Sequence, residues 1–330
     1  MSKLEKFAGD DATISYRSVL VRLGESLEKE TLASPSDTGE LMLHLAEGHR
    51  RLGQTEKAID LFSNSFDLWK RLNTAKGMCW SLWGVGTSLR NASAFDESAR
   101  WLRSAAALAH TAGEQRCRVW SLAQMAEIDR IQGNRKEALA GHQHVLKEFK
   151  ALRDSKGVTW SYLGMGQIFR MEREFVHAVR AFQTAQEMSE GRNDPIGVAW
   201  ALRGQAEIAK ETRDLAKAAA FARRAQDKFR LKGYPTGIGY SLKTLADVTL
   251  LSGRAGDSLL IAESAMKHFR QAGEVRGVAF GLKTIADIES QLGLVREART
   301  KYLGAHRMLN RVSIIEPSSF SPSQGLVNSN

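Results

Sequence analysis

The chain has 330 residues, 43% of them hydrophobic and 25% charged, with two cysteines and a formal net charge of +10. This composition is that of a globular protein that can bury a large core, and it excludes a disulfide-rich scaffold. Residues 1–11 lack the apolar segment of a secretory signal, and no run of about eighteen apolar residues could span a membrane. We therefore expect a cytoplasmic protein in which Cys79 and Cys117 are buried free thiols.

The positive charge favours an acidic partner, such as an acidic peptide, a nucleic acid or an anionic lipid. Lys and Arg are scattered along the chain, however, and form no basic block of the kind that binds nucleic acid. The composition therefore gives a bias towards anionic partners and nothing more specific.

Residues 1–32 are predicted to form an N-terminal capping helix and a linker. Apolar residues recur at helical spacing over 12–30, which indicates one amphipathic helix. The segment 32–37 that follows is rich in Ser, Pro and Asp, and Ser36 or Asp37 is expected to cap the first helix of the next region.

Residues 33–311 repeat with a period of 40 residues. A large aromatic residue recurs once per repeat, at Trp80, Trp120, Trp160, Trp200, Tyr240 and Phe280. A small residue recurs with the same step, at Ala58, Ser98, Ala138, Ala178, Ala218, Ser258 and Ala298. These coincidences define seven units, and a period of this length indicates an array of stacked supersecondary elements.

Each unit is predicted to be a pair of helices. In the unit of residues 157–196, apolar side chains recur at three- and four-residue steps between Tyr162 and Phe169, as on one face of a helix. A polar break at 172–174 precedes a second run of the same spacing, which contains Ala178 and Phe182. No segment shows the alternation of a strand, so the fold class is all-α.

Residues 312–330 are rich in Ser and Pro and are expected to be a disordered C-terminal tail. The last helix pair before this tail carries Tyr302 and Met308 on an outer face without an obvious cap. This leaves room for a homodimer through the terminal repeat.

The repeated positions resemble the tetratricopeptide repeat (TPR), whose pattern is W-x2-L-G-x2-Y…A-x3-F. The best unit matches it at Tyr162, Met165, Gly166, Phe169, Ala178, Phe182 and Ala185. In another unit Asp129 and His142 stand where aromatic residues are usual. The resemblance covers seven units and implies a right-handed superhelical solenoid of helix-turn-helix repeats.

Each unit is about six residues longer than the usual repeat of about 34 residues. This length is similar to a branch of the family that includes spindle-orientation adaptors, bacterial peptide-sensing regulators and the sensor domain of maltose-type transcription activators. The resemblance further implies that the first helix of each pair lines a concave groove.

Motifs that would indicate catalysis or cofactor binding are not found. The Gly-x-Gly segments at 84–86 and 164–166 recur at the repeat period inside helices, so we interpret them as close helix crossings and not as nucleotide loops. His142 and His144 are two residues apart and point to different faces, and no cysteine pair has zinc spacing. No catalytic residue, metal or cofactor is predicted.

Candidate partner-binding residues come from positions that the groove should display once per repeat. One position holds cations, at Arg50, Arg90, Arg130, Arg170 and Lys210. A second changes from Trp83 in an early repeat to cations in later ones, at Arg203, Lys243 and Lys283. A third is polar or acidic and includes Gln167. Such a ladder could grip an acidic or carboxylate-bearing segment, since arginine forms bidentate bonds with oxyanions.

The alternative is that these cations pair with carboxylates of their own helix. Glu127 precedes Arg130 by three residues, and similar pairs recur in other repeats. Arg90 and Arg170 have no carboxylate at that spacing, which makes them the better candidates for binding. The aromatic ladder has the same two interpretations, because its rings could contact a ligand or fill the space between repeats.

From the sequence, the protein is expected to be a non-catalytic protein–protein interaction scaffold or adaptor that binds a peptide or partner protein in the concave groove. The alternative is a TPR protein that senses a ligand or peptide and regulates a partner. An RNA-binding helical repeat is a third hypothesis, supported only by the charge.

Overall fold

A computed structural model describes residues 17–18, 20–21, 24 and 34–311. Residues 34–311 form fourteen helices and contain no strand. The helices are α3 (Pro35–Arg51), α4 (Thr55–Arg71), α5 (Ala75–Asn91), α6 (Phe95–Thr111), α7 (Gln115–Gln132), α8 (Arg135–Ala151), α9 (Ser155–Met171), α10 (Phe175–Glu190), α11 (Pro195–Glu211), α12 (Leu215–Leu231), α13 (Pro235–Leu251), α14 (Ala255–Gln271), α15 (Val275–Gln291) and α16 (Val295–Arg311). Consecutive pairs make seven hairpins, as the 40-residue period predicts.

The predicted N-terminal helix over 12–30 lies outside the described residues apart from isolated positions, and the tail 312–330 lies wholly outside them. At the start of α3 the predicted cap is wrong by a few residues. Ser34 caps the helix, because its Oγ accepts a hydrogen bond from the backbone N–H of Asp37 at 3.2 Å. Pro35 at the first helical position makes Ser34 the last non-helical residue, and Asp37 lies inside the first turn.

All helix junctions share one geometry. A residue with positive φ recurs every 20 residues, at Gly53, Asn73, Ser93, Gly113, Gly133, Arg153, Arg173, Asn193, Arg213, Gly233, Gly253, Gly273 and Gly293. The next amide bonds back across the turn, as Gln54 N does to His49 O at 2.9 Å, which satisfies the end of the helix. Each helix with its turn therefore takes 20 residues, and every hairpin is two equal halves.

Close helix crossings depend on small residues that face large ones. A Cβ added to Gly157 on α9 would lie 2.2 Å from the Phe149 ring on α8, and one added to Gly164 would lie 2.3 Å from the His142 ring. Ala178 and Ala218 are fully buried at equivalent crossings. The Gly-x-Gly segments thus serve helix packing, because only a residue without a side chain lets the neighbouring ring approach the helix so closely.

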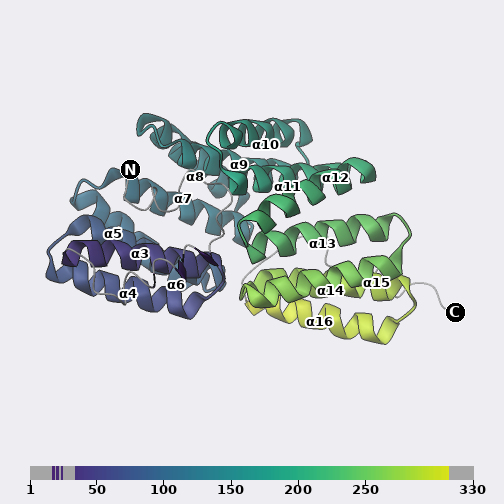
Figure 1. The fold of residues 1–330 in the computed structure, drawn as a ribbon. Helices are drawn as coiled ribbons and strands as arrows, with labels where there is room; N and C mark the ends of the chain where they lie inside the picture. Colours follow the sequence, from purple (N-terminus) through teal and green to yellow (C-terminus); the bar gives the residue numbers. More distant parts are fainter. Residues whose placement is uncertain (1–16, 19, 22–23, 25–33, 312–330) are drawn as a thin grey trace.

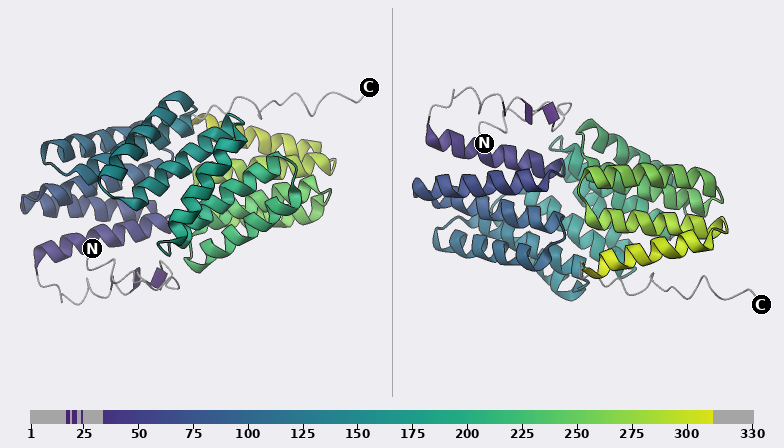
Figure 2. Two further views of the ribbon diagram at one scale, coloured as in Figure 1. Left: turned by 90° about the horizontal axis from the view of Figure 1, so that it is seen from above. Right: turned by 90° about the horizontal axis from the view of Figure 1, so that it is seen from below.

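The stacked hairpins curl so strongly that the two ends of the solenoid meet. Helices α3–α6 and α13–α16 lie as two blocks side by side, joined through α7–α12 (Figures 1 and 2). The α3–α4 turn touches the α14–α15 turn, where a Cβ on Gly53 would be 2.2 Å from the carbonyl oxygen of Ala272. One apolar cluster contains Ile131 of α7 together with Leu309 of α16. The superhelix is therefore a closed ring and not an open crescent.

Candidate ligand-binding cavity

A cavity of about 570 Å³ lies on the inside of this ring. Its walls come from six first helices of the hairpins, namely α5, α7, α9, α11, α13 and α15, and from the residues that cap α13 and α15. The wall of the cavity is therefore built from the first helices of six of the seven pairs, all except α3. Because these helices share one register, equivalent positions of successive repeats stack along the wall.

The cavity gathers most of the side chains that the sequence assigns to the groove. The residues that line it are Arg90, Arg130, Gln167, Arg170, Arg203, Lys210, Lys243 and Lys283. Arg50 and Trp83 do not line it. Arg50 makes a fork with Glu47 on its own helix, with Nε to Oε2 at 2.7 Å. Trp83 packs edge-on against Trp80 and Trp120, with ring centroids 5.4 and 6.5 Å apart.

One part of the wall is a buried ion-pair network. Lys210 Nζ lies 2.9 Å from Glu207 Oε2 on its own helix and 2.8 Å from Asp247 Oδ2 on the next first helix. Lys243 Nζ reaches the same Asp247 oxygen at 2.9 Å, and the Thr244 hydroxyl donates to Glu207 Oε1. Burial alone would raise the pKa of Glu207, but Lys210 and Lys243 outweigh it and hold that pKa well below its usual range.

A second network surrounds Glu127. Arg130 donates from Nε and Nη2 to the two carboxylate oxygens at 2.8 and 2.7 Å, and Arg90 approaches from the previous repeat at 3.9 Å. Burial would raise the pKa of Glu127, yet these guanidiniums lower it to about 2. The ring of His142 is fully buried, with Nε2 at 3.9 Å from Glu127, and burial lowers its pKa to about 4.

Arg90 and Arg170 thus find their carboxylates on the following repeat. Arg170 Nη1 pairs with Glu211 of α11, and its Nε donates to Gln167 Oε1 at 3.2 Å. The absence of an acidic residue three positions earlier therefore does not leave these two arginines without a partner. Sequence spacing within one helix cannot detect these pairs, because the partners are 37 and 41 residues away.

Arg203 and Arg276 differ from all of these cations. The others contact carboxylates, whereas these two lie over aromatic rings. The guanidinium carbon of Arg203 lies 4.7 Å from the centroid of the Tyr240 ring and 5.6 Å from that of Trp200. That of Arg276 lies 5.6 Å from Phe280. Neither arginine is within 4.0 Å of a carboxylate oxygen in the described part of the chain. Burial lowers the pKa of Arg203, and the charge of Glu207 opposes that shift only partly.

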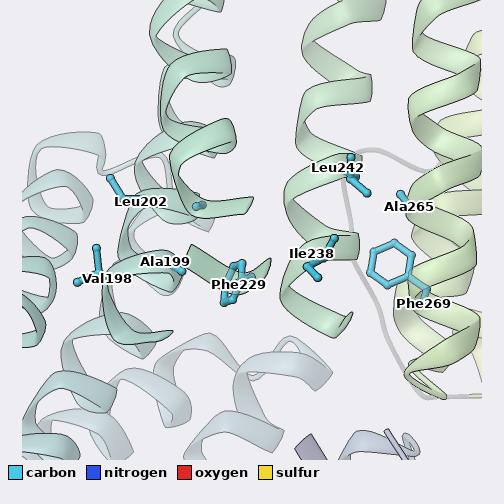
Figure 3. Close-up of a cluster of buried hydrophobic side chains, with 9 residues drawn as sticks. Val198, Ala199, Leu202, Phe229, Ile238, Leu242, Ala265 and Phe269 are labelled. Carbon is cyan, nitrogen blue, oxygen red and sulfur yellow. The ribbon is translucent and has the colours of Figure 1, made fainter. Parts of the chain in front are cut away.

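The rings below these cations are fixed from behind by the core. Trp200 packs on Phe229 and Tyr240 on Phe269, each with centroids 4.9 Å apart. Figure 3 shows Phe229 and Phe269 within a cluster that links the helices of two successive hairpins. The aromatic ladder therefore fills the space between repeats, and its later rings also hold the two guanidiniums. Contact of these rings with a ligand stays a prediction.

Unsatisfied polar atoms of the cavity wall are all hydrogen-bond donors. Four buried nitrogens among the lining residues have no partner in the described structure, namely Nε of Arg90, Arg203 and Arg276 and Nε1 of Trp160. No lining residue has a buried oxygen in this condition. Eight basic side chains and six carboxylates line the cavity, which leaves an excess of two positive charges. Such a wall is complementary to an anion rich in acceptor oxygens.

Sequence reasoning missed several of the residues that shape this wall. Trp160, Trp200 and Tyr240 were visible as a ladder, but their periodicity does not say which part of each ring faces the cavity. Glu274 belongs to a periodic acidic position with Glu114, Asp154 and Asp194, which the sequence analysis did not use. The position of Arg276 is basic in the early repeats, but it is interrupted by Ile at 196 and Thr at 236. Only the curl of the solenoid brings the start of α15 to the cavity.

No family model matches the sequence, and no curated protein matches it either. Several solved structures are similar to this chain. A Rap protein in complex with Competence and Sporulation Factor is 14% identical, with a TM-score of 0.69 over 90% of this chain and 85% of that one. The fold is that of a tetratricopeptide-type solenoid.

Two larger proteins contain the same architecture. The APC/C hetero-tetramer Cut9–Hcn1 matches with a TM-score of 0.56 and 14% identity over 92% of this chain and 52% of that one. A signal-transduction ATPase with a tetratricopeptide repeat sensor from Pyrococcus horikoshii matches with a TM-score of 0.50 and 12% identity, over 90% of this chain and 52% of that one. At these identities the likeness is one of fold.

Three further properties concern the described residues only. None of their helices combines the length and the apolar character needed to cross a membrane. Nowhere among them do three His, Cys, Asp or Glu side chains gather in a way that could hold a metal ion. Cys79 and Cys117 are buried free thiols in contact with each other on α5 and α7.

Proposed function

We propose that the protein is a non-catalytic interaction scaffold that binds an anionic segment of a peptide or partner protein in the cavity inside its ring. The observation that carries this proposal is the set of four buried donors without an acceptor, Nε of Arg90, Arg203 and Arg276 and Nε1 of Trp160. A buried donor without a partner costs about 1–3 kcal/mol, and a ligand that supplies acceptors recovers this free energy on binding.

The ion-pair networks of the cavity support a binding role. General acids and bases work best with a pKa near the operating pH. Here the networks move the pKa of Glu127, Glu207 and Asp247 downwards and that of Lys210 upwards, away from neutrality. These groups keep fixed charges, which suits recognition. The fold agrees with this role, because the similar Rap structure is itself a complex with a factor.

The proposal is tested by affinity capture from a native lysate with three forms of the protein, analysed by mass spectrometry. The cavity variant Arg90→Gln/Arg203→Gln should lose the specific partner, whereas Arg223→Gln/Arg224→Gln should retain it. The control removes the same charge from exposed positions on α12. Circular dichroism must show both variants folded. Equal capture by all three forms would place the binding site outside the cavity.

A second candidate function is a ligand-sensing regulator, and the closure of the ring favours it. The Gly53 turn and the Ala272 turn meet where the superhelix closes, so an occupant of the cavity that prefers one curvature would bias the equilibrium between closed and open rings. A change of the radius of gyration on binding, measured by small-angle X-ray scattering, would support the sensor. A radius of gyration that does not change on binding would contradict the sensor and favour the scaffold.

A further inference from the structure

Among the donors of the cavity, Arg203, Arg276 and Tyr240 form the group with the least compensation. Both arginines stack on rings and have no carboxylate within ion-pair distance in the described residues. A guanidinium held over a ring by a cation–π contact still has N–H groups that can donate to an oxyanion. The two cations are therefore arranged to bind an anion that the protein itself does not supply.

The Tyr240 hydroxyl lies within the electrostatic influence of Glu274 and of the two arginines, Arg203 and Arg276. Burial and Glu274 raise the pKa of Tyr240, and the guanidiniums of Arg276, Arg203 and Arg130 oppose the rise. The hydroxyl is thus protonated and can donate. Its acceptor, Glu274 Oε1, is 3.5 Å away, the limit of a hydrogen bond. A ligand oxygen closer to the Tyr240 hydroxyl would therefore accept a stronger hydrogen bond than Glu274 does.

Burial also raises the pKa of Glu274, although Arg276 and Arg90 lower it in part. Its negative charge is therefore not held in place by a close ion pair, unlike the charges of Glu127 and Glu207. Glu274 is the carboxylate that contacts Tyr240, and over the whole cavity the basic side chains exceed the carboxylates by two.

We infer that Arg203, Arg276 and Tyr240 form a subsite for a phosphoryl group on the bound segment, an inference that rests on the proposed function of the cavity. A phosphoryl monoester carries a charge of about −1.5 to −2 and three acceptor oxygens. These match two uncompensated guanidiniums and one phenol. A single carboxylate has one charge and two oxygens, so it leaves one donor and one positive charge unsatisfied.

The part of the subsite formed by Arg203 and Tyr240 is packed against the core before any ligand arrives, which favours affinity. Phe229 and Phe269 back the rings of Trp200 and Tyr240, and Tyr240 and Trp200 in turn hold Arg203. Little side-chain entropy remains to be lost when an oxyanion binds.

The experiment is isothermal titration calorimetry at constant ionic strength and neutral pH, with inorganic phosphate, acetate and succinate as probes. Phosphate should bind the wild type more tightly than either carboxylate. Arg203→Gln and Arg276→Gln should each weaken phosphate binding at least about tenfold, since each removes a charge-assisted pair of bonds. Tyr240→Phe should weaken it by a smaller factor. Arg223→Gln, the exposed control, should bind phosphate as the wild type does.

The inference is overturned if phosphate binds no better than succinate, or if Arg203→Gln and Arg223→Gln bind it equally. A short blocked phosphoserine peptide and its unphosphorylated form then identify the source of the group. Preference for the phosphorylated peptide assigns it to a peptide segment, whereas binding of inorganic phosphate alone assigns it to a small anion. Partner loss from the Arg90→Gln/Arg203→Gln variant without any phosphate binding would keep the proposed function and remove this subsite.

Discussion

The cavity wall contains two kinds of cation that a sequence pattern does not separate. Lys210 and Lys243 share Asp247 and Glu207 in a buried network, whereas Arg203 and Arg276 rest on aromatic rings without a close carboxylate. The networked cations are bound to the protein itself and stabilise the stack of repeats. The stacked cations are the ones that we propose bind a ligand. A charge on the concave face therefore indicates binding only where the neighbouring repeat leaves it uncompensated.

The largest effect is expected where the networked region is broken. Glu207→Gln keeps the shape of the side chain and one acceptor oxygen for the Thr244 hydroxyl, but it removes the negative charge that faces Lys210. Loss of one partner from a buried pair should destabilise the protein by about 3 kcal/mol. Thermal unfolding followed by circular dichroism measures the change. A midpoint equal to that of the wild type would show that the network is structurally neutral.

The next effect concerns His142, which lies beside the second network. Its pKa of about 4 is lower than the value of 6.5 for an unperturbed histidine, so the unfolded chain binds an extra proton between these values. Stability should therefore fall by up to about 3 kcal/mol as the pH drops from about 6.5 to about 4. Phe62 and Phe182 occupy the equivalent positions, and His142→Phe should flatten this part of the profile. A profile of the same slope in the variant would contradict the assignment.

The third prediction compares two glycines that have the same backbone geometry but differ in their contact with the other end of the ring. Gly53 and Gly253 both have φ of +79°, but a Cβ meets the backbone of Ala272 only at Gly53. Alanine at either site should cost about 1 kcal/mol of left-handed strain. Gly53→Ala should in addition open the ring, which small-angle X-ray scattering would detect as a larger radius of gyration. Equal radii for the two variants would mean that the ends are not held together by this contact.

The smallest effect on stability is expected in the stacked region. Arg203→Gln removes a cation–π contact but also a buried charge without a close partner, so the midpoint should change by less than about 1 kcal/mol. Together with the large cost of Glu207→Gln, this outcome would establish that the two regions have different roles. A loss as large as that of Glu207→Gln would assign Arg203 to structural support.

The sequence by itself determined the local structure and the order of the repeats. The spacing of apolar residues gives helices, the period of 40 gives seven hairpins, and the shared register places Arg90, Arg130, Arg170 and Lys210 on one wall. These properties depend on contacts within a hairpin or between neighbours, and such contacts leave a periodic trace in the chain. The Ser34 cap and the 20-residue half-period were less visible, because six of the turn residues are not glycine.

Only the tertiary structure decided which of these residues line the cavity. The curvature of a solenoid is the sum of small rotations at each crossing, and each rotation depends on the volumes packed there, such as the Phe149 ring on Gly157. The total curvature brings Arg276 to the cavity and closes the ring at Gly53. The stacking of successive repeats also places Arg170 beside Glu211. No single repeat encodes the total curvature, because a small change at any crossing would shift every later repeat.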